Sequence, residues 1–240
     1  MKLTRPTCIL FDLDNTVYAY EPCHVAGIMA AQRLAATLDP RWSTATEFAR
    51  DYAQARQVVK RQVGPQSAGH CRLLYFKNMV EAQFGRTDIE ATRRLHEAYW
   101  GGYFSKMTPD PGCMELLHDL RASSVRLAWV SNYTTERQML KLRALGLEQA
   151  ADFLITSEEV GVEKPNSTVL DHALARLKAG PEEAWMVGDD LEEDIGAARV
   201  LGLTAVWFRR QDGTGGSEVP NFTVSNWFEL RELLDRERNH

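Results

Sequence analysis

The sequence predicts an α/β fold, a doubly wound parallel sheet with an inserted all-helical domain. Two observations support this prediction: short apolar runs that end abruptly in polar residues, and helical patterns of about ten residues that alternate with them. The apolar runs cover residues 7–11, 125–130, 152–155 and 184–187. Strands and helices that alternate in this way form βαβ units with right-handed crossovers, and such units build a parallel sheet.

The first predicted strand, Thr7–Phe11, runs directly into Asp12-Leu13-Asp14-Asn15-Thr16. A continuous apolar run suits a strand that is buried on both faces of a parallel sheet. The polar sequence that follows it suits a functional loop at the end of that strand.

The inserted segment, residues 21–104, breaks the alternation of strands and helices. It contains amphipathic helical patterns and no convincing buried strand. We therefore expect two domains, a core formed by residues 1–20 and 105–240 and a helical cap formed by 21–104. Because the chain leaves and re-enters the core beside the end of the first strand, we expect the cap to act as a mobile lid.

The remaining core elements follow in regular order. Helical patterns lie at about 111–122, 135–145, 167–177 and 193–201, and Gly146 and Gly202 are placed as C-terminal stops for two of them. A fifth strand at 204–208, a flexible loop near 212–217 and a terminal helix near 227–237 complete the predicted domain.

Composition excludes several classes of protein. The 28 Lys and Arg residues are outnumbered by 33 Asp and Glu residues, which gives a net charge of −5. A chain without a basic excess is not expected to bind nucleic acid or an anionic membrane. No signal-peptide pattern opens the sequence, so we expect a cytoplasmic protein.

The four cysteines are widely spaced and form no C-x-x-C pair, so any metal is expected to have oxygen ligands. The oligomeric state, monomer or homodimer, stays open.

Polar side chains follow every predicted strand at the edge where an open α/β sheet binds its ligand. They are Asp12, Asp14, Ser131, Asn132, Asp189, Asp190 and Asp194, with Lys164 in the loop 161–165. Several carboxylates in one place repel one another, and a single lysine does not balance three of them. A hard divalent cation does, and Mg²⁺ fits best because it accepts a few carboxylates together with water and phosphate oxygens.

The two acids at 12 and 14 suggest phosphoryl chemistry. If the extended geometry continues past the strand, their side chains face the same way. One can attack phosphorus while the other protonates the leaving alcohol and later activates water. Ser131 and Lys164 can then bind the phosphoryl oxygens.

Four sequence motifs resemble those of the haloacid dehalogenase (HAD) superfamily. Asp12-Leu13-Asp14-Asn15-Thr16 is similar to motif I, Ser131-Asn132 to motif II, Lys164-Pro165 to motif III and Gly188–Ile195 to motif IV. Their order, with a helical insertion after motif I, resembles a subfamily I member with a C1 cap on a Rossmann-like core. The resemblance covers almost the whole chain.

The resemblance implies a role for each matching residue. Asp12 would be the nucleophile and Asp14 the general acid/base, and both would contribute to the metal site with Asp189, Asp14 through its backbone carbonyl. Ser131, Lys164 and, less securely, Asn132 would bind phosphate. Asp194 would be a supporting carboxylate. Asp190 is less securely matched and is better explained as favouring a helix N-terminus.

The expected function is Mg²⁺-dependent hydrolysis of a small phosphomonoester, a nucleoside monophosphate or sugar phosphate, through an aspartyl-phosphate. Alternatives are a phosphomutase of the same superfamily, a non-catalytic interaction module and, more distantly, a metal-free dehalogenase. Some cap side chains could contact the substrate, although a charged helix face is usually solvated. They are His24, Arg56, Lys60, Arg61, His70, Arg72, Tyr75 and Lys77.

Overall fold

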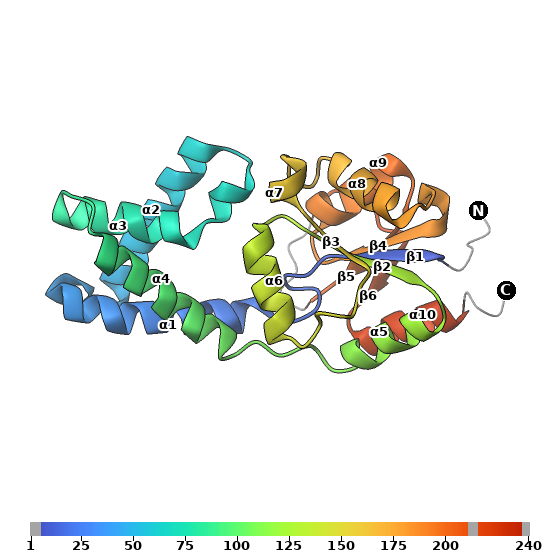
Figure 1. Cartoon of the computed structure of the whole chain (residues 1–240), viewed down its shortest axis with the longest axis horizontal. Helices are drawn as coiled ribbons and strands as arrows, with labels where there is room; N and C mark the ends of the chain where they lie inside the picture. Colours follow the sequence, from blue (N-terminus) through green and yellow to red (C-terminus); the bar gives the residue numbers. More distant parts are fainter. Residues whose placement is uncertain (1–5, 211–215, 237–240) are drawn as a thin grey trace. The chain divides into compact units, whose positions relative to one another are not determined.

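The computed structural model describes residues 6–210 and 216–236. Its sheet has six parallel strands in the order β3-β2-β1-β4-β5-β6 (Figure 1). The strands are β1 (Cys8–Phe11), β2 (Arg126–Ser131), β3 (Phe153–Thr156), β4 (Ala184–Gly188), β5 (Thr204–Phe208) and β6 (Phe222–Val224). The predicted α/β class with a parallel sheet is therefore confirmed.

The central position of β1 decides where the site lies. Phe11, the last residue of β1, is in register with Trp129 of β2 on one side and with Val187 of β4 on the other. All four residues of β1 are buried. The loop that follows β1 therefore begins between the carboxyl ends of β2 and β4, which is where an open α/β sheet binds its ligand.

Helices cover both faces of the sheet (Figure 1). One face, with Leu10, Val130 and Met186, packs into an aliphatic core with α8 and α9. On the other face, Phe11 stacks on Trp227 of α10 with ring centroids 5.4 Å apart. The helices of the core unit are α5 (Cys113–Ala122), α6 (Thr135–Ala144), α7 (Ser157–Val160), α8 (Thr168–Leu177), α9 (Ala197–Leu201) and α10 (Trp227–Arg236).

The inserted segment forms a compact helical unit, Tyr20–Met107, and the remainder of the chain forms the other unit. The predicted boundaries differ from these by one residue at the first crossing and by three at the second. The helices of the inserted unit are α1 (Tyr20–Leu38), α2 (Ala45–Val63), α3 (Arg72–Phe84) and α4 (Ile89–Phe104), with 3-10 turns at Pro40–Ser43 and Ser67–His70. Its role as a lid stays a prediction.

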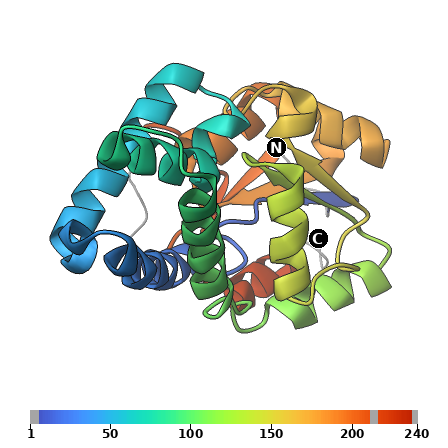
Figure 2. The same cartoon turned by 60° about the vertical axis from the view of Figure 1, so that its left-hand side comes forward.

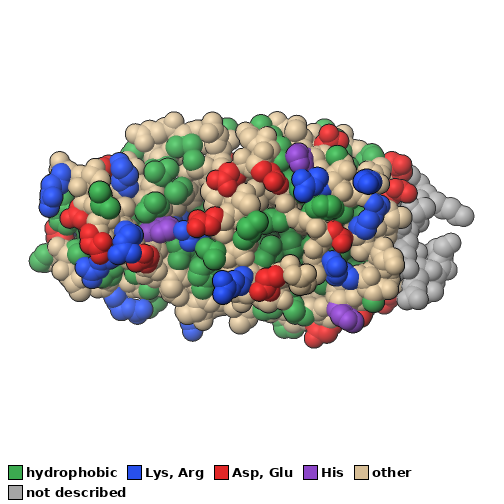
Figure 3. Space-filling model, viewed as in Figure 1, with side chains coloured by type: hydrophobic (Ala, Val, Ile, Leu, Met, Phe, Trp, Pro, Cys, Tyr) green, Lys and Arg blue, Asp and Glu red, His purple; other side chains and the backbone are tan. Residues whose placement is uncertain are grey.

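Several local details differ from the sequence prediction. The short strand β6 was not expected, and the helix predicted at 193–201 is divided into a π-helical turn, Leu191–Gly196, and α9. The loop predicted near 212–217 falls largely outside the described residues, as does the last residue of the predicted terminal helix. Among the described helices, none has the length and apolar character that a membrane crossing requires. On the face shown in Figure 3, acidic and basic side chains are intermixed.

Two glycines allow α1 and α4 to lie side by side (Figures 1 and 2). A Cβ on Gly27 would lie 2.9 Å from the Tyr99 ring, and a Cβ on Gly102 would lie 2.5 Å from the Ala26 carbonyl oxygen. Neither position has room for a side chain, so the close packing of these helices depends on glycine.

We therefore expect opposite effects from alanine at two adjacent positions of α4. Gly102→Ala should lower the free energy of unfolding by about 1–3 kcal/mol because it overpacks the contact with α1. Gly101→Ala should raise it by about 0.5–1 kcal/mol, because its Cβ would meet nothing within 4 Å and alanine favours the helix. Thermal unfolding of both variants checks this, and shifts of the same sign would contradict the assigned packing.

Candidate active site

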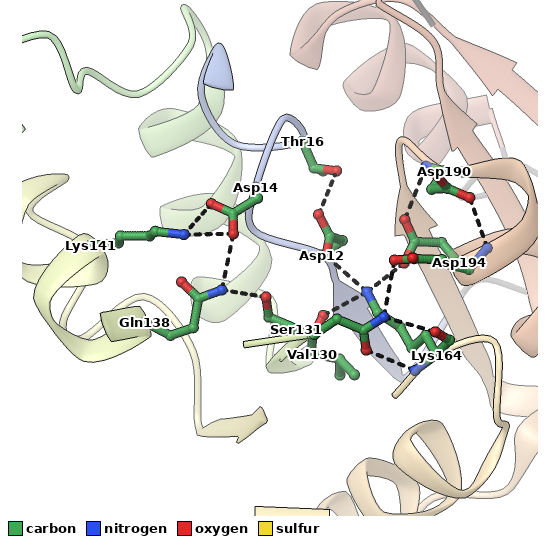
Figure 4. Close-up of polar contacts among 12 residues, drawn as sticks. Asp12, Asp14, Thr16, Val130, Ser131, Gln138, Lys141, Lys164, Asp190 and Asp194 are labelled. Carbon is green, nitrogen blue, oxygen red and sulfur yellow. Dashed lines mark hydrogen bonds and ion pairs between the residues drawn. The ribbon is translucent and has the colours of Figure 1, made fainter. Parts of the chain in front are cut away.

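Asp12 stands at the first position after β1 and is buried. Its backbone N–H donates to the Val187 carbonyl at 2.9 Å, so the pairing with β4 continues one residue past the strand. One carboxylate oxygen accepts from Lys164 Nζ at 2.8 Å and the other from the Thr16 hydroxyl at 3.2 Å (Figure 4). The sheet therefore fixes the main chain of Asp12 while two side chains orient its carboxylate.

Lys164 is surrounded by oxygen atoms and is almost completely buried. Its ammonium group donates to Asp12 at 2.8 Å, to Asp194 at 2.5 Å and to the Val130 carbonyl at 3.1 Å (Figure 4). Burial alone would lower the pKa of Lys164, but the two carboxylates outweigh it and raise the pKa above its usual range. Lys164 is therefore a permanent cation with all three of its hydrogens engaged.

Asn132 holds the main chain of Lys164. Its side-chain oxygen accepts from the Lys164 N–H at 2.7 Å, and its amide nitrogen donates to the Lys164 carbonyl at 2.8 Å. The same nitrogen donates to Glu193 at 3.0 Å. The side chain therefore positions the Lys164 loop, and the predicted contact of Asn132 with substrate stays a prediction.

Three carboxylates converge beside Lys164. Each of Asp12, Asp189 and Asp194 offers an oxygen, and these oxygens lie within 4.8 Å of one another. Burial raises the pKa of all three above the usual value of an aspartate, and their mutual repulsion adds to this effect while Lys164 opposes it. A buried set of oxygen donors with excess negative charge is the chemistry that a hard divalent cation satisfies.

A glycine makes room for this cluster. A Cβ on Gly188, the last residue of β4, would lie 2.2 Å from a carboxylate oxygen of Asp194. Asp190 caps the next helical turn by accepting from the N–H groups of Glu192 and Glu193, both at 2.8 Å. This agrees with its interpretation as a residue of the helix N-terminus.

Asp14 has different partners from Asp12. Its carboxylate accepts from Lys141 Nζ at 2.6 Å to each oxygen and from Gln138 at 3.2 Å (Figure 4). It also accepts from the Tyr18 hydroxyl. Burial alone would raise the pKa of Asp14, but Lys141 and the hydrogen bonds outweigh burial and lower it. Asp14 is therefore ionised in this structure.

The chain changes direction directly after Asp14, and that Asp12 and Asp14 face the same way stays a prediction. The chain turns at Asn15, which has a φ of 65°, and Asp14 forms an isolated bridge with Tyr18. The two carboxylates are bound to different lysines, Lys164 and Lys141. The carboxylate of Asp14 is therefore held by side chains of α6 and by Tyr18, and not by the lysine that holds Asp12.

Gln138 and Lys141 were not predicted from the sequence, where Lys164 was counted as the one cation among the carboxylates. Both lie on α6, and Gln138 also donates to the hydroxyl of Ser131, at the end of β2. The available signal was their position on the buried face of α6 with Leu142 and Leu145, at the spacing 138, 141, 142 and 145. Two partners of Asp189 were also not predicted. Asn15 donates to its side chain, and Trp207 donates to its carbonyl.

The geometry described above can be compared with known proteins. A family model described as haloacid dehalogenase-like hydrolase matches residues 6–202. The chain belongs to this family. The membership of the HAD superfamily that the four motifs predicted is therefore confirmed.

Several similar proteins are phosphatases by name. A ribulose-1,5-bisphosphate 5-phosphatase of Halopiger xanaduensis is 41% identical over 212 residues, which cover 88% of each chain. The pyrimidine 5'-nucleotidase YjjG of Escherichia coli K12 is 29% identical over 94% of this chain and 96% of its own. The crystal structure of a HAD phosphatase from Thermococcus onnurineus has a TM-score of 0.72 at 25% identity, covering 95% of this chain and 97% of that one. The expected enzyme class, a phosphoric monoester hydrolase of the HAD superfamily, is confirmed.

The contact between Asp14 and Lys141 can be tested by a double-mutant cycle. Lys141→Met should lower the free energy of unfolding by roughly 3 kcal/mol, because it leaves a largely buried carboxylate without its cation. In an Asp14→Asn background the same substitution should cost much less, since the charge is gone. Chemical denaturation of the four proteins measures the coupling, and equal losses in both backgrounds would show that the ion pair is not what Lys141 stabilises.

Proposed function

We propose that this HAD hydrolase is a Mg²⁺-dependent phosphatase that cleaves a small phosphomonoester through an aspartyl-phosphate on Asp12. The observation that carries the proposal is the buried carboxylate of Asp12, held by Lys164 beside Asp189 and Asp194. A nucleophile in such a place needs its charge screened, and both the lysine and the carboxylate donors suit that purpose.

Asp12 and Asp189, together with the backbone carbonyl of Asp14, would hold the metal, with Asp194 next to them. These are hard oxygen donors, which fit Mg²⁺. When bound, the ion would supply charge screening of the carboxylates and of the phosphoryl oxygens. The proposed metal ligands differ from the three converging carboxylates only in that Asp14 takes the place of Asp194.

The chain's own residues suit the two halves of the reaction. In the first half, an oxygen of Asp12 bonds to phosphorus, the bond from phosphorus to the ester oxygen breaks, and Asp14 in its protonated form gives that proton to the leaving alcohol. In the second half, Asp14 takes a proton from water as the water attacks the aspartyl-phosphate. The ionised state of Asp14 beside Lys141 is the state that the second half requires. The proton that Asp14 takes from water in that half is the one that it gives to the next leaving alcohol.

Ser131 would donate a hydrogen bond to the phosphoryl oxygens, and Lys164 would act on them through its charge. The Ser131 oxygen accepts a hydrogen bond from Gln138, so the hydroxyl hydrogen can be donated to an anion. Lys164 brings a permanent positive charge to the same group. We propose a sugar phosphate as the substrate, because the relative at 41% identity is a ribulose-1,5-bisphosphate 5-phosphatase. Nucleoside monophosphates are tested as well, because another relative is a pyrimidine 5'-nucleotidase.

The first test measures phosphate release with Mg²⁺ from ribulose 1,5-bisphosphate, ribulose 5-phosphate and nucleoside monophosphates. Asp12→Asn should lower the rate by about a thousandfold or more because the nucleophile is lost. Asp171→Asn, an exposed acid on α8, should keep the rate of the parent chain. Full activity in Asp12→Asn would refute the mechanism, and an isomerised sugar phosphate without free phosphate would identify a phosphomutase.

The second test concerns the metal. EDTA should abolish phosphate release and added Mg²⁺ should restore it. Mg²⁺ should also raise the melting temperature of the EDTA-treated chain, by the equivalent of about 2.7 kcal/mol at a hundredfold excess over its Kd. Asp189→Asn should reduce that rise. Activity that survives EDTA, without any thermal response to Mg²⁺, would exclude the metal.

A further inference from the structure

The loop that follows β5 contacts the loop that follows β1. Because β5 is parallel to β4 and ends at Phe208, the residues after it leave the sheet at the same edge as Asp12 and Asp189. Arg210 is the second of these residues. It belongs to the same compact unit as the candidate active site, and its side chain is 20% exposed. A largely buried guanidinium group needs partners for its charge and for its N–H donors.

Arg210 binds the main chain of the loop after β1. Its Nε donates to the Asn15 carbonyl, and one of its Nη atoms lies 3.5 Å from the Thr16 carbonyl oxygen. The same Nη donates to the carboxylate of Asp110. The Asp110 N–H in turn donates to the Val17 carbonyl at 2.9 Å. Arg210 and Asp110 together therefore contact three consecutive carbonyl groups of this loop.

The side chains of the same loop orient two of the converging carboxylates. Thr16 donates to Asp12 at 3.2 Å, and Asn15 donates to Asp189 at 2.7 Å. Asn15 has a φ of 65°, a left-handed conformation that is unfavourable for a residue other than glycine. Such a conformation persists where the surrounding structure holds it, so the contacts of Arg210 with this main chain matter for both carboxylates.

An arginine suits this position better than a lysine does. The guanidinium group is planar and presents its N–H groups in fixed directions, so one edge can bind a carbonyl and a carboxylate together. The ring of Phe208, with its centroid 5.6 Å from the guanidinium carbon, further restricts this plane. The ion pair with Asp110 compensates the charge, and the Nε–H is left for the main chain of the loop.

We propose that Arg210 is a positioning residue of the active site. It fixes the main chain at Asn15 and Thr16, whose side chains hold Asp189 and Asp12. This inference rests on the proposed function, since it gives Arg210 a part in orienting the nucleophile. A residue of this kind acts through the geometry of other groups, so its loss slows the chemical step without removing a group that contacts the substrate.

Hydrogen exchange tests the loop directly and without turnover. Within the loop, the Val17 N–H donates to the Leu13 carbonyl at 3.1 Å. In full-length Arg210→Met this amide should exchange about tenfold faster, because hydrogen bonds from a charged group no longer oppose local opening. Arg231→Met is the matched control. It removes an ion pair with Asp119 from the same unit but no contact with the loop, so the Val17 exchange rate should stay that of the unmodified chain.

Steady-state kinetics separate positioning from folding. With the ester that the unmodified chain hydrolyses fastest, and well below the melting temperature, Arg210→Met should lower kcat about ten- to hundredfold. KM should change much less, because Ser131 and Lys164 lie outside the loop after β1. Arg210→Lys keeps a cation for Asp110 but not the planar fork, so it should restore the melting temperature more fully than kcat. Arg231→Met should keep the kcat of the unmodified chain.

Three results would overturn the proposal. One is an unchanged Val17 exchange rate in Arg210→Met, and another is an unchanged kcat in that variant. The third is a kcat and a melting temperature that Arg210→Lys restores in the same proportion, which would indicate a structural role alone.

The outcomes also distinguish this inference from the proposed function. If the unmodified chain releases no phosphate from any ester but the Val17 amide exchanges faster in Arg210→Met, only the proposed function fails, and Arg210 is still the residue that holds the loop. If phosphate is released and Arg210→Met has the kcat of the unmodified chain, only the inference about Arg210 fails.

Discussion

The rest of the site depends on the ion pairs that the ammonium group of Lys164 forms with Asp12 and Asp194. The ammonium group is buried with Asp12 and Asp194, and a buried carboxylate that loses its cation is strongly destabilising. One cation opposes three converging carboxylates, so the cluster keeps an excess of negative charge. That excess contributes to the raised pKa of the three acids, and it is the feature on which the proposed metal site is based.

The sheet order turns residues that are distant in sequence into neighbours. Because β1 lies between β2 and β4, the loops after these strands begin at one edge, and Asp12, Ser131 and Asp189 come from three of them. Asp14 belongs to the same loop as Asp12 but is bound to α6 through Lys141. The site thus has two separately charged halves, one built around each lysine, which suits a reaction that needs a nucleophile and a proton carrier in different states.

Much of this arrangement could be predicted from the sequence because buried parallel strands are continuous apolar runs. The strands β1 to β5 and the polar residues after them were found in this way, as was the helical insertion. The strand β6 escaped because three residues are too few to show a pattern. Lys141 escaped because a lysine in an amphipathic helix is ordinarily assigned to the solvent face, and only its partner, 127 residues away, explains its burial. The carboxylate of Asp14 is held by Lys141 and Gln138 of α6, contacts that strand periodicity cannot describe.

The bonding of Asn132 makes position 132 a junction between three parts of the chain. Its side-chain nitrogen donates to the Lys164 carbonyl and its side-chain oxygen accepts from the Lys164 N–H, the two hydrogen bonds that a neighbouring strand would make. The same nitrogen also donates to Glu193. An aspartate would place an acceptor against a carbonyl and a carboxylate, and a threonine would be too short to span both groups of the peptide. Asn132, the residue that follows β2, therefore fixes the loop that carries the Lys164 ammonium group, and a substitution at position 132 would first change the position of Lys164.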